Sequence, residues 1–474
     1  MTKRDPQKTR GGKRPAGRKK SAAANAATDS PAAPKKGHRK GRPAEAGASR
    51  AKRGPKNNTS APKGGPRQRR ALTHVGGDIR KAGDDTMADR LAVAARPPES
   101  SDPRRITHGF HTWPARLHPF TAGKLIEASP NGPIADPFMG GGTVLVEAMI
   151  AGRDAIGSDI NPIAAEVAWA RTRVWSREQV TAVVPRTEAI VSASRARRRQ
   201  RLPKDLWERE GSWYDPPALA DLWSLAQAIQ ALPQDDPFRR LARIMLSSIL
   251  IKASKQVSDS VVRLDTQHRF VPSGRVDQWL VARAREVRDG LKWLARANQA
   301  KNPPLIGLAD ARQPPGTSVL ADGTVAAIVS SPPYPGIYDY VAHHQRRYAM
   351  LGFGADLAVE REIGARREMR RGRDVAVRGY VTAIAEVLSA WKPKLRTDGL
   401  VHLVVGDGQD DAGTIGSLPL VAQAGRQSGF EVMASVSQPR PTFGPKHRVN
   451  APKEEHIITL RRAGGAAIST EQQG

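Results

Sequence analysis

No cysteine occurs among the 474 residues of this chain. Disulfide bonds and cysteine-bearing zinc sites are therefore excluded. Any reaction that needs a cysteine thiolate as nucleophile, such as methylation of cytosine at carbon 5, is excluded as well. No apolar run approaches the ~18 residues that a membrane span needs, and the first residues lack the apolar core of a secretory signal peptide. These absences predict a cytoplasmic protein that does not bind a membrane.

Acidic residues are scarce relative to basic ones. The 46 Asp and Glu against 76 Lys and Arg give a formal net charge of +30, which favours a polyanionic partner. Residues 1–70 hold 22 of the basic residues and only three acids. Residues 1–100 also contain few large apolar residues, so we expect a disordered basic tail there. Within it, residues 39–43 (Arg-Lys-Gly-Arg-Pro) resemble an AT-hook core, the alternative being a general polyanion-binding segment.

A Ser-Pro-Pro-Tyr tetrad at residues 331–334 directly follows an apolar run, Val325 to Val329, that is typical of a buried parallel strand. The two prolines hold the backbone extended and leave carbonyls as acceptors without N–H donors. Ser331 adds a hydroxyl acceptor, and Tyr334 offers an aromatic face. Acceptors beside an aromatic platform suit the exocyclic amine of a flipped-out base, whereas a proline-rich turn is the alternative interpretation.

A glycine loop lies upstream, at residues 136–143 (Asp-Pro-Phe-Met-Gly-Gly-Gly-Thr), between an expected strand and an apolar helix that ends near Gly152. Gly140 and Gly142 let the backbone approach a ligand closely. The loop matches neither the phosphate-binding P-loop nor the Gly-x-Gly-x-x-Gly pattern of dinucleotide sites. Asp159 ends the next expected strand, where an acid suits hydrogen bonding to ribose hydroxyls.

Together the loop and the tetrad resemble the S-adenosylmethionine-dependent amino-methyltransferases of DNA. The resemblance covers roughly residues 106–171 and 304–462. It implies S-adenosyl-L-methionine as the cofactor and assigns cofactor binding to Asp136, Pro137, Phe138, Gly140, Gly142, Thr143, Asp159 and Asp310. It assigns catalysis to Ser331, Pro332, Pro333 and Tyr334. The segment 108–119 resembles the stretch that closes over the methionine end of the cofactor.

Histidines at 108, 111 and 118 lie in that same segment. No acid stands at a helical spacing from them, so we interpret them as packing and hydrogen-bonding residues and predict no metal site. For His343 and His344 a packing role is favoured over contact with a substrate phosphate.

Alternating strands and helices predict an α/β fold of the Rossmann-like methyltransferase type, with a mostly parallel, doubly wound sheet. The expected strands include Leu305 to Ala309, Leu400 to Gly406, Phe430 to Val436 and His456 to Leu460, with a helix from Tyr380 to Leu395. Helical apolar spacing between residues 172 and 303 predicts an all-helical insert, a possible target-recognition region. It contains an arginine cluster at 195–201 that suits contact with phosphates, the alternative being a solvated run of charges. The expected division is therefore a tail at 1–100, methyltransferase parts at 101–171 and 304–474, and the insert at 172–303.

The residue types suggest direct methyl transfer without a covalent enzyme intermediate. Ser331 Oγ and the Pro332 carbonyl would accept the amine hydrogens, and Tyr334 would stack on the base. In the resembling family, serine at the first tetrad position accompanies cytosine N4 more often than adenine N6. We therefore expect a DNA cytosine-N4 methyltransferase. The alternatives are a DNA adenine-N6 enzyme, an RNA enzyme acting on guanine N2, and a binding protein that has lost activity.

Overall fold

The structure, a computed structural model, describes residues 77–113, 116–259, 261–410, 412–440 and 453–464. The basic segment 1–70 and its AT-hook-like residues 39–43 lie outside the described residues. The strands are β1 (Arg80–Gly83), β2 (Ile134–Asp136), β3 (Ala155–Asp159), β4 (Gln256–Ser258), β5 (Val261–Leu264), β6 (Leu305–Leu308), β7 (Val325–Ser330), β8 (Leu395–Gly406), β9 (Gly408–Asp410), β10 (Gly413–Ile415), β11 (Phe430–Pro439) and β12 (Glu454–Arg462).

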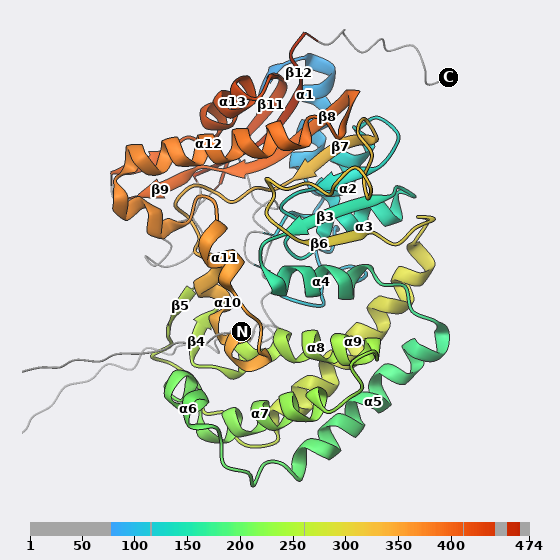
Figure 1. Ribbon diagram of the computed structural model, residues 1–474, viewed down its shortest axis with the longest axis vertical. Helices are drawn as coiled ribbons and strands as arrows, with labels where there is room; N and C mark the ends of the chain where they lie inside the picture. Colours follow the sequence, from blue (N-terminus) through green and yellow to red (C-terminus); the bar gives the residue numbers. More distant parts are fainter. Residues whose placement is uncertain (1–76, 114–115, 260, 411, 441–452, 465–474) are drawn as a thin grey trace, which may run out of the picture. The chain divides into compact units, whose positions relative to one another are not determined.

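The helices alternate with the strands through much of the chain (Figure 1). They are α1 (Asp85–Ala95), α2 (Pro119–Glu127), α3 (Thr143–Ile150), α4 (Pro162–Thr172), α5 (Arg177–Arg195), α6 (Lys204–Glu210), α7 (Pro216–Gln230), α8 (Pro237–Ala253), α9 (Arg275–Ala297), α10 (Tyr340–Leu351), α11 (Asp356–Arg361), the 3-10 helix η2 (Arg366–Arg371), α12 (Arg373–Trp391) and α13 (Ser417–Gln427). Within the described residues, none of these helices is both long and apolar enough to cross a membrane.

Eight strands form one sheet in the order β1-β11-β12-β8-β7-β2-β3-β6. The run from β8 to β6 is parallel throughout, whereas β12, β11 and β1 add three antiparallel pairings at the other edge. The chain moves from β2 outward through β3 to β6 and then returns to place β7 on the opposite side of β2. This reversal creates a crevice at the carboxyl ends of β2 and β7, where ligands bind in doubly wound sheets. The predicted Rossmann-like α/β fold class is confirmed.

Both faces of the sheet are buried along its central strands β2, β7 and β8, as their apolar composition requires. In β8, Leu400 and Val404 pack with α1, α2 and α3, whereas Val401 and Val405 pack with α12 and α13 on the opposite face. This two-residue alternation follows from the strand geometry. The two helical layers hold the strand ends, and hence the loops that follow them, in fixed positions.

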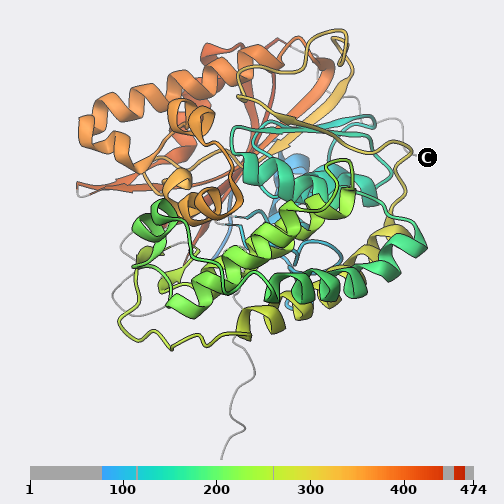
Figure 2. The ribbon, with the colours of Figure 1, turned by 60° about the horizontal axis from the view of Figure 1, so that its bottom comes forward.

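The part of the chain between β3 and β6 includes helices α5 to α9 (Figures 1 and 2). The apolar side chains of these helices form a second core. Several start at signals visible in the sequence, such as the capping box of Ser176 and Gln179 in α5 and the Asp236-Pro237 start of α8. Helix α10 follows the tetrad in sequence but contributes Tyr348 and Leu351 to this same core. The insert is therefore packed directly against the segment that follows the tetrad.

Three expectations need correction. The insert is not all helical, because β4 and β5 pair as an antiparallel hairpin between α8 and α9. A disordered tail up to residue 100 is wrong for its last part, since β1 pairs with β11 and Leu91 of α1 is fully buried. The helix expected up to Leu395 ends at Trp391, because Leu395 already belongs to β8. In each case long-range pairing or packing outweighs the local pattern.

Candidate functional site

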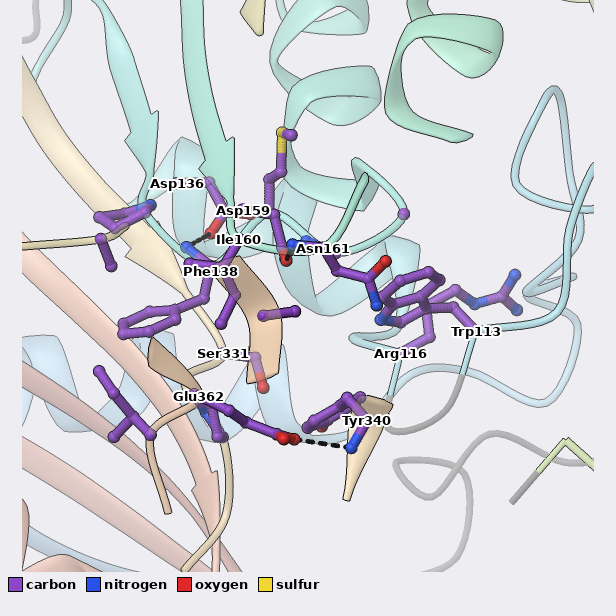
Figure 3. A pocket seen from close by; sticks show the side chains of 18 of the residues that line it. Trp113, Arg116, Asp136, Phe138, Asp159, Ile160, Asn161, Ser331, Tyr340 and Glu362 are labelled. Atoms are coloured by element: carbon purple, nitrogen blue, oxygen red, sulfur yellow. Dashed lines mark hydrogen bonds between the residues drawn. The ribbon is translucent and has the colours of Figure 1, made fainter. Parts of the chain in front are cut away.

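A cavity of about 930 Å³, including its open mouth, lies at the carboxyl ends of the parallel strands (Figure 3). Among the residues that we predicted for the site, it is lined by Asp136, Pro137, Phe138, Gly140, Thr143, Asp159, Asp310, Ser331 and Pro333. Residues from four separate strand ends thus meet around one space.

The glycine loop turns tightly between β2 and α3. Gly140 and Gly142 have φ values of 47° and 75°, in the left-handed region that favours glycine. A Cβ atom on Gly140 would lie 2.8 Å from Trp113 Nε1, and one on Gly142 would lie 2.9 Å from the Ala168 Cβ. Gly142 does not line the cavity but caps α3. Side chains at these two positions would clash with Trp113 and Ala168, so this turn requires glycine.

Two carboxylates lie beneath the loop. Ser330 Oγ donates to Asp136 Oδ1 at 2.6 Å, and the Gly140 amide donates to Asp159 Oδ2 at 3.0 Å. Burial raises the pKa of Asp136 to about 7 and that of Asp159 to about 6, although hydrogen bonds to both carboxylates oppose the shift. Both groups are therefore sensitive to pH near neutrality.

Asn161 is a site residue that the sequence analysis missed. Its Oδ1 accepts from the Ile163 amide and so caps α4. Its side chain also interacts with the Tyr348 hydroxyl of α10. Asn161 lines the cavity, so its side-chain amide can contact a ligand there. The Asn-Pro start of α4 was visible in the sequence, but it indicated only a helix cap.

The third strand end differs from the expectation in one respect. Asp310 lines the cavity, yet its carboxylate is held by Arg312, whose Nη2 lies 2.6 Å from Asp310 Oδ2. Burial alone would raise the pKa of Asp310, but the hydrogen bonds and charge of Arg312 leave it below its usual value. Asp310 is thus ionised, and Arg312 already takes up part of its capacity to accept hydrogen bonds.

The tetrad is divided between the cavity and the protein core. Ser331 and Pro333 line the cavity, and Ser331 Oγ donates to the Val404 carbonyl at 3.0 Å. Pro332 lines a separate apolar hollow beside Trp391. The ring of Tyr334 is 3% exposed and packs in the core, with its hydroxyl 3.1 Å from Glu455 Oε1. The structure therefore does not place Tyr334 where a base would stack.

The histidines of the upstream segment have partners within the protein. His108 Nε2 lies 2.7 Å from Glu147 Oε1, His111 Nε2 lies 2.9 Å from Ser247 Oγ, and His118 accepts from the Phe120 amide. These contacts agree with the packing and hydrogen-bonding interpretation.

His343 and His344 are buried as well. His344 stacks on Trp113 with ring centroids 4.5 Å apart. Because burial keeps both side chains away from solvent, the packing interpretation fits them better than contact with a phosphate.

Arg171 joins the upstream segment to the glycine loop. This fully buried side chain of α4 donates to the Gly141 carbonyl at 2.7 Å, to the His111 carbonyl at 2.6 Å and to the His108 carbonyl at 3.0 Å. Burial lowers its pKa well below the usual value. No local sequence pattern indicates this role, because the three carbonyls lie 30 to 63 residues away along the chain.

The arginine cluster of the insert has a partly structural role. Arg198 is paired with Asp277 of α9 at 2.6 Å and with Asp221 of α7 at 2.9 Å. This arginine therefore stabilises the contacts among insert helices. Arg199 and Arg201 belong to the same cluster, and the predicted phosphate contact remains a prediction for them.

No family model matches the chain. Over 78 residues, 15% of its length, it is 35% identical to the type II methyltransferase M.MvaI of Kocuria varians, of which the match covers 17%. Among solved structures, an rRNA methyltransferase, aviRa from Streptomyces viridochromogenes, matches 78% of this chain and 96% of its own length, at 13% identity and a TM-score of 0.32. Structural similarity this low supports no inference about function. The chain is similar to a DNA methyltransferase over a short stretch.

Proposed function

We propose that this protein is an S-adenosylmethionine-dependent methyltransferase that acts on an exocyclic amine of a DNA base. The observation that carries the proposal is the cavity in which the glycine loop, Asp159 and Ser331 meet at adjacent strand ends. The short similarity to a type II DNA methyltransferase supports the same activity. Cytosine N4 is the preferred target, with adenine N6 and guanine N2 of RNA as alternatives.

The cavity fits the cofactor in three respects. Gly140 lines the cavity without a side chain, Asp159 offers carboxylate oxygens to ribose hydroxyls, and Asn161 contributes a side-chain amide to the cavity wall. Asp310 would accept from the adenine amino group. Trp113 and Leu117, from the upstream segment, line the same cavity. When bound, the cofactor would supply an electrophilic methyl group on its sulfonium.

Ser331 and Pro333 form the wall at which the target amine would lie. Ser331 Oγ donates its own hydrogen to the Val404 carbonyl and also lies near the Tyr334 hydroxyl. A hydroxyl oxygen has two lone pairs, so Ser331 can still accept a hydrogen bond from the amine. Because Tyr334 is buried, we assign base stacking to Tyr340 instead, which lines the cavity and lies 5.5 Å from Tyr338 between ring centroids. Tyr334 would then support the tetrad from beneath.

The helical insert is our candidate for target recognition. Arg347 of α10 is buried and hydrogen-bonds to Asp259, which follows β4, and to the Ser247 carbonyl of α8. Helix α10 begins at Tyr340 beside the cavity. DNA contacts made by the insert would therefore affect the position of Tyr340 at the base site through this one helix.

Methyl transfer is tested directly by incubating the full chain with tritiated S-adenosylmethionine and either DNA or RNA. Nucleoside mass analysis of the product then identifies the base. Label in N4-methylcytosine of DNA supports the preferred target, and label in N6-methyladenine or in RNA supports one of the alternatives. Absence of label in both nucleic acids, with cofactor bound, would contradict the proposal.

Replacing Ser331 by alanine should lower turnover by about tenfold to a hundredfold, because one acceptor for the amine is lost at the transition state. Affinity for S-adenosylhomocysteine, measured by calorimetry, should change less than twofold. Ser318→Ala, on an exposed residue, is the matched control. Equal losses of affinity and turnover in Ser331→Ala would place Ser331 in the cofactor site instead.

Cofactor affinity should decrease as the pH falls from 7 to 5. Burial raises the pKa of Asp159 to about 6, so its protonated fraction grows through this range. Donation from ribose hydroxyls favours the ionised carboxylate and lowers its pKa, so binding releases protons. Calorimetry with S-adenosylhomocysteine in two buffers of different ionisation enthalpy measures this release. Asp159→Asn should abolish most of it; an unchanged release in that variant would assign the proton to another group, such as Asp136.

A further inference from the structure

Glu362 is a buried carboxylate in the cavity wall that no sequence pattern identified. It directly follows α11, is 7% exposed, and lines the same cavity as Ser331 and Pro333 (Figure 3). Burying a carboxylate is costly unless hydrogen bonds compensate. Its position beside the tetrad therefore needs an explanation.

Two donors from different segments fix the carboxylate. The Tyr340 amide, at the start of α10, donates to Glu362 Oε1 at 2.7 Å, and Arg367 Nη1 of η2 donates to Oε2 at 2.5 Å. Each carboxylate oxygen accepts more than one hydrogen bond. Acceptor capacity therefore remains on both oxygens after these two bonds.

The other three carboxylates of the cavity wall have other partners. Asp136 is held by Ser330 and the Phe138 amide, Asp159 by the amides of Gly140 and Asn161, and Asp310 by Arg312. Asp136 and Asp159 end strands β2 and β3, and Asp310 follows β6, all on the side that we assign to the cofactor. Glu362 instead comes from the segment that connects α10 to α12.

Methylation of an amine requires an acceptor for the displaced proton. A serine hydroxyl is too weak a base at neutral pH to take that proton, and Tyr334 is buried against Glu455. We propose that the Glu362 carboxylate accepts a hydrogen of the target base's exocyclic amine and takes the proton released by methyl transfer. This inference depends on the proposed function, which it deepens by naming the proton acceptor.

The step balances as follows. The amine nitrogen forms a bond to the methyl carbon while the bond from that carbon to the sulfonium sulfur breaks and its electron pair stays on sulfur, which becomes a neutral thioether. The nitrogen gives one proton to the Glu362 carboxylate and so becomes a neutral secondary amine. The carboxylic acid then returns the proton to solvent as the products leave. No oxidant, reductant or covalent enzyme intermediate takes part.

Several charged or titratable groups face Glu362. Arg367 favours its ionised form, whereas Asp339 opposes it, and burial is the largest influence and raises its pKa. Tyr340 and Tyr348 of α10 also lie close enough to interact with its charge. A carboxylate with a raised pKa is a better proton acceptor near neutrality than an ordinary glutamate.

The test compares three variants of the full chain: Glu362→Gln, Glu362→Asp and the matched control Glu360→Gln, on an exposed residue of α11. Turnover on DNA is measured with tritiated cofactor from pH 5 to 9, and affinity for S-adenosylhomocysteine is measured by calorimetry. Glu362→Gln should lower kcat by about a hundredfold or more while affinity changes less than twofold. With the cofactor saturating at every pH, so that protonation of Asp159 does not limit binding, the acidic limb of the kcat profile should disappear. Glu360→Gln should behave as wild type.

Glu362→Asp keeps the carboxylate, so it should keep the acidic limb with a reduced rate. If Glu362→Gln does not fold, this variant shows whether the carboxylate takes the proton. Glu362→Gln with wild-type kcat and pH profile would overturn the inference alone. Parallel losses of turnover and S-adenosylhomocysteine affinity would also overturn it, by making Glu362 a cofactor ligand. A wild-type protein that binds cofactor but methylates neither DNA nor RNA would overturn the proposed function, and the inference with it.

Discussion

Replacing Arg171 by methionine should weaken binding of S-adenosylhomocysteine by about tenfold to a hundredfold. The guanidinium donates to carbonyls of the glycine loop and of the segment at 108–111, and hydrogen bonds from charged groups contribute roughly 1.5–3 kcal/mol each. Methionine has similar length but no donor, so the carbonyls of Gly141, His108 and His111 lose their partner. Removal of a buried charge offsets part of this loss. We expect a net decrease of about 2–4 kcal/mol in the free energy of unfolding.

Calorimetry and urea unfolding measure the two effects separately. Arg173→Met is the matched control, because Arg173 follows α4, is exposed and stacks on Trp169 instead of contacting the loop. It should leave cofactor affinity within twofold of wild type. If Arg171→Met bound S-adenosylhomocysteine as tightly as this control, the loop would not need Arg171 to hold its position.

Replacing Glu210 by alanine should lower the free energy of unfolding by about 3–5 kcal/mol, the range for breaking one partner of a buried ion pair. Glu210 of α6 lies 2.9 Å from Arg346 Nε of α10, and the two side chains are only 2% and 5% exposed. Arg346 also lies over the Trp213 ring, 4.0 Å from its centroid. The alanine variant leaves this arginine buried and unpaired. Turnover should fall as well, because α10 begins at the cavity.

Urea unfolding of Glu208→Ala provides the comparison, because Glu208 lies on the same helix but is exposed and pairs only with Lys204. That change should alter stability by less than about 1 kcal/mol. Adding Arg346→Met to Glu210→Ala should restore part of the stability, since the unpaired charge is then removed. Equal destabilisation by Glu208→Ala and Glu210→Ala would show that the buried pair does not couple the insert to α10.

Most of the cavity wall that we assign to the cofactor was predictable from the sequence. The glycine loop and the acid at position 159 directly follow apolar runs, so strand periodicity and turn chemistry place them at strand ends. Parallel strands then bring their carboxyl ends to one edge without further information. Local rules suffice here because each residue's position depends on its own strand and turn.

The base side of the site could not be predicted in the same way. The tetrad looks continuous in the sequence, yet the packing of α12 and β12 against it buries Tyr334 and leaves only Ser331 and Pro333 at the cavity. Glu362 enters the wall because the Tyr340 amide and Arg367 hold it there. These contacts join residues that no common helix or strand periodicity relates, so a sequence pattern does not predict them.

The sequence by itself determined the doubly wound sheet, the glycine loop and the strand-end acids, because hydrophobic period, helix caps and positive-φ glycines act over a few residues. Only the tertiary structure decided that β1 and α1 complete the sheet and its cover, that Arg171 links the glycine loop to the segment at 108–111, and that α10 joins the insert to the cavity. These features depend on burial and hydrogen bonding between distant segments, whose energies a local sequence pattern does not encode.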